Sequence, residues 1–242
     1  MKIAFFAFFM VAAITADGGT VLKRSNGAIL SIDGHSYRLD LPESKEPRAH
    51  DAIVSSDGDK TATYLNQGNR TWFQRGSDSV GATSLRFGIP LLAKVEKHHV
   101  EWHDEPAEPI AGHPATKRVL RINYSLIHDM SGTLIRSKVS AIILLTATAD
   151  LPPVVQPDIR TRFPEIDREL SAALSSMAGL LVAQALTVTQ TYDGGKPFTD
   201  VQSWTTDSIV EKPLPASMFK VPQGFVHQLP QVGTMEMQHA NR

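Results

Sequence analysis

From Asn26 onward the chain alternates apolar and polar residues with a period close to two, which is typical of β-strands that pack one face on a core. Turn residues interrupt the alternation, as at Asp33-Gly34, where glycine accepts the positive φ that a tight hairpin requires. The expected strands are 28–32, 37–41, 52–55, 61–65, 71–74, 90–102, 116–128, 133–147, 185–192 and 201–210. The pattern predicts a mainly β protein (α+β) built around a meander of antiparallel strands.

The strand expected at 116–128 has two faces of different character. One face carries apolar side chains at alternate positions, and the other carries Arg121, Asn123 and Ser125. Such a strand lies on a core on one side and faces water on the other. Three prolines, at positions 106, 109 and 114, predict a turn-rich stretch before it, and residues 129–132 predict a hairpin link after it.

One segment has the spacing of a helix. Pro164 suits a first helical position, and apolar residues then recur at intervals of three and four. These residues are Ile166, Leu170, Leu174, Met177 and Leu181. We therefore expect one helix near residues 164–184 that covers the sheet.

The apolar stripe of this helix has two interpretations. It either completes the core, or it covers the sheet incompletely and leaves space for an acyl chain or another apolar ligand. In the second case Leu170, Leu174, Met177 and Leu181 would contact the ligand, and the flexible thioether of Met177 would adapt to its shape. The sequence leaves both interpretations open.

The N-terminus has the pattern of a secretory signal peptide, with Lys2, an apolar run over 3–13 and small residues up to Ala16. The run is shorter than the about 20 residues that span a membrane. We expect a signal peptide over 1–16, one mature domain over 17–226 and a loose polar tail over 227–242. The chain has no cysteine, which excludes disulfides, thiolate metal sites and a lipoprotein anchor. These features predict a soluble periplasmic or secreted protein.

Charge and motifs narrow the function classes. The formal net charge is −1, and no run of lysine and arginine interleaved with aromatic residues predicts nucleic-acid binding. The later apolar runs are too short to span a membrane. Phosphate-binding, dinucleotide-binding, calcium-binding and nucleophile-elbow motifs are missing from the sequence. We expect a monomer without a cofactor and without a membrane span.

A histidine-rich segment is a candidate for a metal site. On a strand, His99, Glu101 and His103 share one face, at intervals of about 6.6 Å. Imidazole and carboxylate groups suit zinc or copper. The main interpretation is a solvated sheet face, and the alternative is a metal site in a metal-dependent enzyme.

Several turn and strand motifs resemble a family of uncharacterised exported bacterial proteins, the DUF4412 type, which is close to the LolA-like half-barrels. The matching segments are 32–34, 37–40, 53–58, 71–73 and, most closely, 214–225, which reads LPASMFKVPQGF. The resemblance implies a strongly curved antiparallel sheet, a LolA-like half-barrel, with a helix on its concave side. It also implies a relation to proteins that carry lipids or lipoproteins in the apolar space between sheet and helix.

These observations together favour a non-enzymatic periplasmic protein that binds a lipid or another apolar ligand between sheet and helix. One alternative is an interaction module that contacts envelope proteins through an exposed sheet face or edge. The other alternative is the metal-dependent enzyme built on His99, Glu101 and His103.

Overall fold

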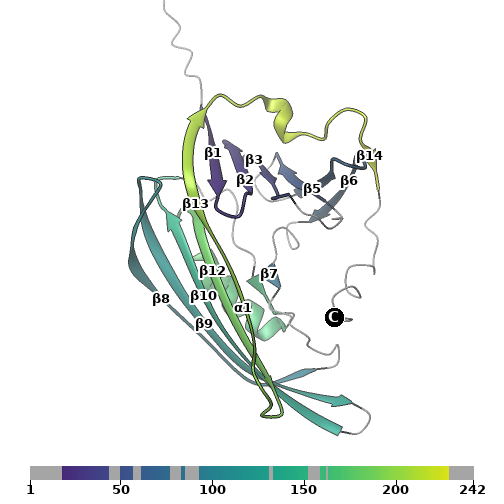
Figure 1. Ribbon diagram of the computed structural model, residues 1–242, viewed down its shortest axis with the longest axis vertical. Helices are drawn as coiled ribbons and strands as arrows, with labels where there is room; N and C mark the ends of the chain where they lie inside the picture. The colour runs from purple at the N-terminus through teal and green to yellow at the C-terminus, as the bar shows by residue number, and fades with distance from the viewer. Residues whose placement is uncertain are drawn as a thin grey trace, which may run out of the picture.

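The structure, a computed structural model, describes residues 18–43, 50–56, 61–76, 83–84, 93–130, 133–151, 159–161 and 163–228. The expected signal peptide and almost all of the expected tail lie outside the described residues. Most described residues belong to one large, curved and open sheet with a single α-helix inside its curve (Figure 1). This architecture confirms the predicted mainly β fold with a curved sheet and a covering helix.

The large sheet has twelve strands in the order β14-β6-β5-β4-β3-β2-β1-β13-β12-β10-β9-β8. Neighbouring strands are antiparallel except for β14 and β6, which are parallel. Its strands are β1 (Gly19–Arg24), β2 (Ile29–Asp33), β3 (Ser36–Asp40), β4 (Ala52–Ser55), β5 (Thr61–Asn66), β6 (Thr71–Gly76), β8 (Lys94–Ile110), β9 (His113–Met130), β10 (Thr133–Thr148), β12 (Leu180–Tyr192), β13 (Phe198–Lys212) and β14 (Val226–His227). A separate parallel pair is formed by β7 (Thr83–Ser84) and β11 (Ile159–Arg160).

Strand β13 joins a half of short strands to a half of long strands. Its residues 198–205 pair with β12 in the long half, and residues 206–212 pair with β1 in the short half. The chain then crosses from β13 to β14, at the far edge of the short half (Figure 1). This crossing includes the 3₁₀ helix η2 (Ala216–Phe219), whose Phe219 is buried. The segment 214–225, which carries the resemblance, therefore spans the short strands.

Helix α1 (Pro164–Ser175) packs on the inner, concave face of the long half. Ile166, Leu170 and Leu174 of the helix share one core cluster with Leu120 and Ile143 of the sheet. The helix starts at the predicted residue, because proline fits its first turn. Burial of this stripe supplies most of the stability of such a short helix.

The helix ends at Ser175, and the prediction of helix up to residue 184 is wrong. Gly179 has a positive φ of +85°, and a side chain there would collide with the carbonyl of Thr148. The chain therefore turns sharply beside β10 and enters β12 at Leu180. Leu181, predicted as a helical residue, is a strand residue of β12.

The predicted turn-rich stretch around the three prolines is also wrong. Pro106 and Pro109 lie within β8, and Pro114 lies at the start of β9. Strand β8 is at the edge of the sheet, where proline is tolerated because one side of the strand has no ladder partner to lose. The turn itself is only Ala111-Gly112, and both residues have positive φ.

Arg118 of β9 fastens the end of α1 to the sheet. Its guanidinium donates to Asp104 of β8 through Nε and Nη2, both at 2.7 Å. Its Nη1 donates to the carbonyl of Ala173 and, at 2.7 Å, to Oγ of Ser176. These bonds satisfy a carbonyl at the helix C-terminus, where intrahelical donors run out. They also hold the pKa of Asp104 below its usual value, chiefly through the hydrogen bonds from Arg118.

Candidate binding face

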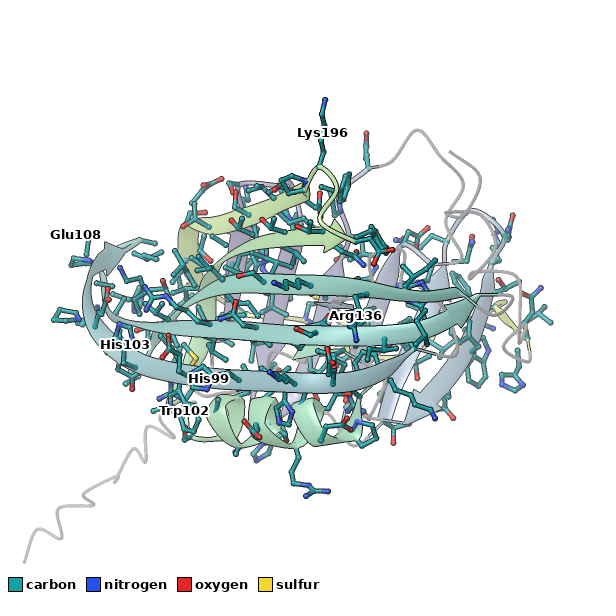
Figure 2. The ribbon with its side chains drawn as sticks, turned by 90° about the horizontal axis from the view of Figure 1, so that it is seen from below. His99, Trp102, His103, Glu108, Arg136 and Lys196 are labelled. Atoms are coloured by element: carbon teal, nitrogen blue, oxygen red, sulfur yellow. The ribbon has the colours of Figure 1, made fainter. Side chains whose placement is uncertain are left out.

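The face of the long half that points away from α1 is a broad surface, which we call the outer face. Antiparallel register places its side chains in rows that run across the strands. Row one is Lys97, Ser125, Lys138 and Thr191. Row two is His99, Asn123, Ser140, Thr189 and Thr199. Row three is Glu101, Arg121, Ile142, Thr187 and Val201. Row four is His103, Val119, Leu144, Ala185 and Ser203. Figure 2 looks onto strands β8, β9 and β10 from the side of this face.

Carboxylates of the outer face lie next to cations. The ion pairs are Glu96–Arg136 at 3.9 Å, Glu101–Arg121 at 3.6 Å and Glu105–Lys117 at 2.8 Å. The pKa of Glu105 is lowered, first by the hydrogen bond from Lys117 and then by the one from His103. These pairs are exposed, so each contributes little to stability.

His99, Glu101 and His103 share the outer face, as the alternation predicts. They are spaced along β8 and do not converge on one point (Figure 2). Nε2 of His99 lies 3.5 Å from Oε2 of Glu101, while Nε2 of His103 lies 2.9 Å from Oε1 of Glu105. Within the described ranges, no group of three histidine, aspartate or glutamate residues is placed to hold a metal ion. The geometry favours the interpretation of a solvated sheet face.

A hollow of about 470 Å³ lies on rows one and two, and we call it the lysine hollow. Its polar side chains include Lys97 and Lys138 at its two sides, Ser125 between them, and His99, Asn123 and Ser140 in the next row. Because neighbouring strands are about 4.8 Å apart, the two lysine Cα atoms are about 10 Å apart. None of the lining residues is an aspartate or glutamate. The lysine hollow is therefore cationic and rich in hydrogen-bond donors.

Apolar side chains form a small centre on row three. Ile142 is 42% exposed and Val201 is 64% exposed, with Thr187 between them on β12. A further hollow, of about 300 Å³, touches Leu144 and Ala185 of row four. The outer face thus combines an exposed apolar centre with polar and charged surroundings.

The four residues predicted to contact an apolar ligand lie on the other side of the sheet. Leu170 is fully buried, Leu174 and Leu181 are nearly so, and Met177 packs against the same core cluster. The structure brings them together from α1, from β12 and from the segment between. The lysine hollow and the hollow at row four are not lined by any of them. Contact with an apolar ligand stays a prediction.

The lysines of the hollow were not predicted from the sequence. Lys97 and Lys138 come from different strands, and only the register between strands places them in one row. The role of Arg118 was not predicted either, although the sequence holds a signal for it: this charged residue is in phase with the apolar positions Leu120 and Ile122. A charge in an apolar phase indicates a buried partner.

Comparisons of the chain with protein families, with curated proteins and with solved structures find no match. No helix in the described part of the chain has the length and apolarity needed to cross a membrane.

Proposed function

We propose that this is a non-enzymatic binding protein, exported to the periplasm, that holds a partner protein on its outer face. The observation that carries the proposal is the exposed apolar centre of Ile142 and Val201 within rows of polar and charged residues. Protein interfaces have this composition, with an apolar centre and a polar rim. Export is supported by the N-terminal sequence pattern and by the lack of cysteine.

The shape and chemistry of the outer face favour a protein over a small ligand. Small molecules bind mostly in concave pockets that enclose them, whereas the hollows of this face are open to solvent. The four rows contain no tryptophan, tyrosine or phenylalanine, the residues on which bases stack. A broad, open surface with an apolar centre suits another folded protein.

Binding of a lipid or another apolar ligand between the sheet and α1 has less support. The stripe of α1 is already covered by the sheet, and Leu170 and Ile166 have no exposed area. A ligand in this place would have to displace core contacts. The outer face needs no such rearrangement.

Val201 and Phe198 of β13 provide a matched test. They are similarly exposed, at 64% and 59%, but they lie on opposite faces of the sheet. We expect Ile142→Asp/Val201→Asp to release the protein from its complex, because a charge would be buried at the interface. Phe198→Asp should leave the complex unchanged. Native gel migration in extracts of the protein's own cell envelope measures both variants.

Two results would contradict the proposal. One is a complex that survives in the double variant, and the other is a complex that Phe198→Asp disrupts as well. Circular dichroism on the purified variants should show that both remain folded, because all three side chains are exposed and their replacement should change the free energy of unfolding by no more than about 0.5 kcal/mol.

A further inference from the structure

We infer that the lysine hollow binds carboxylates of an acidic, extended segment of the partner protein. This inference rests on the proposed function and names the chemistry that the partner must present.

The outer face is cationic although the chain has a formal net charge of −1. Between the level of Lys94 and that of Glu105, β8, β9 and β10 present six cations and three carboxylates on this face, a difference of +3. The cations are Lys94, Lys97, Lys117, Arg121, Arg136 and Lys138, and the carboxylates are Glu96, Glu101 and Glu105. Such a surface attracts an acidic partner and raises its association rate.

The excess charge is concentrated at the hollow. Each of the three carboxylates pairs with an arginine or with Lys117. Lys97 and Lys138 have no carboxylate within ion-pair distance among the described residues. Their charges are therefore available to an incoming anion.

The donor set of the hollow matches carboxylates. Ionised carboxylates only accept hydrogen bonds, and the hydroxyl of Ser125 and the amide of Asn123 lie on neighbouring rows of β9 to donate them. The two lysines flank Ser125, so both can approach one carboxylate. Alternatively, each lysine can bind one of two carboxylates that lie two residues apart in an extended segment, at a separation of about 6.6 Å.

The apolar centre favours a protein segment as the source of these carboxylates. Row three lies about 13 Å along the strands from row one, within reach of the same extended segment. A polypeptide can present acidic side chains to the hollow and apolar side chains to Ile142 and Val201. A phosphate polymer or a free anion offers only the charge.

The test uses a fluorescein-labelled, end-blocked decapeptide of alternating glutamate and threonine, with the glutamine–threonine peptide as its uncharged counterpart. We expect Lys97→Gln/Lys138→Gln to weaken binding of the acidic peptide by about tenfold or more, measured by fluorescence anisotropy at constant ionic strength. The matched control Lys117→Gln/Arg121→Gln removes the same formal charge from the same face, but from cations already paired with glutamates. It should weaken binding by less than about threefold.

Equal losses in both double variants would overturn the inference, because they would show attraction to the whole face and not to the hollow. Displacement of the peptide by inorganic phosphate, but not by chloride at equal ionic strength, would also overturn it in favour of a phosphate site.

The native-gel assay separates this inference from the proposed function. A complex that survives Lys97→Gln/Lys138→Gln but not Ile142→Asp/Val201→Asp contradicts the hollow alone. A complex that survives both double variants contradicts the proposed function itself.

Discussion

The two faces of the long half are made by alternate residues of the same strands, yet they differ in burial and in polarity. On the inner face, Leu120, Ile122 and Leu126 of β9 are fully buried beside α1. On the outer face of the same strand, Arg121 and Asn123 are exposed. One set of strands can therefore separate stability from binding, because the residues of one face can be substituted while those of the other face stay unchanged.

Two arginines of β9 show the same contrast at the level of single residues. Arg118, on the inner face, is only 5% exposed and binds Asp104, Ser176 and the carbonyl of Ala173. Arg121, on the outer face, makes one exposed ion pair, with Glu101. An arginine thus stabilises the fold at position 118, whereas the arginine three residues later is a surface charge.

The largest effect is expected from a cavity on the inner face. Leu170→Ala should lower the free energy of unfolding by about 2–5 kcal/mol, because Leu170 is fully buried between α1 and the sheet. Leu134→Ala in β10 is the control, since this exposed leucine should contribute less than about 0.5 kcal/mol. Urea denaturation followed by circular dichroism measures both. Equal stabilities would show that α1 is not an integral part of the core.

A smaller loss is expected from the inner arginine. Arg118→Ala should cost about 2–3 kcal/mol, because it removes charged hydrogen bonds to Asp104 and Ser176 and one of the two side-chain donors to the Ala173 carbonyl. Arg121→Ala should change the free energy of unfolding by less than about 1 kcal/mol. Thermal and urea unfolding of the two variants compare them directly. If Arg121→Ala is the more damaging substitution, our assignment of the faces is wrong.

The smallest effect is a dependence on pH. The folded-state pKa of Asp104 is lowered, so its stabilising contribution is present above its ordinary pKa of 3.8 and is lost as the pH falls through the lower folded value. We expect Asp104→Asn to be less stable than the wild type at neutral pH and to lose less stability on acidification below pH 3.8. In an Arg118→Ala background, Asp104→Asn should change the free energy of unfolding, and its dependence on pH, much less. An undiminished effect there would show that Arg118 does not cause the shift.

Much of the fold could be predicted because it depends on local alternation. The strand at 52–55 and the start of the helix at Pro164 agree with the structure. The end of the helix could not be predicted, since Leu181 continues the helical spacing although it belongs to β12. After the helix has ended at Ser175, the positive φ of Gly179 beside Thr148 turns the chain into β12, and this is a contact between distant segments.

The lysine hollow could not be predicted, because it depends on register between strands. The ladder of β8 and β9 shifts between Val95 and Lys97, so that Lys97 lies opposite Ser125. A shift of one residue moves every following side chain to the other face. Without it, His99 and Lys97 would point to the core side. The sequence shows which residues alternate, but it does not show which face of the sheet each of them takes after a bulge.

The most direct test of the outer face as the binding face is photocrosslinking from β13 in the cell envelope. A photoreactive phenylalanine analogue replaces either Val201 or Phe198, which are similarly exposed on opposite faces. We expect one discrete crosslinked protein from position 201, lost when Ile142→Asp is added, and none from position 198. Crosslinking from position 198 alone, or equally from both positions, would contradict the account.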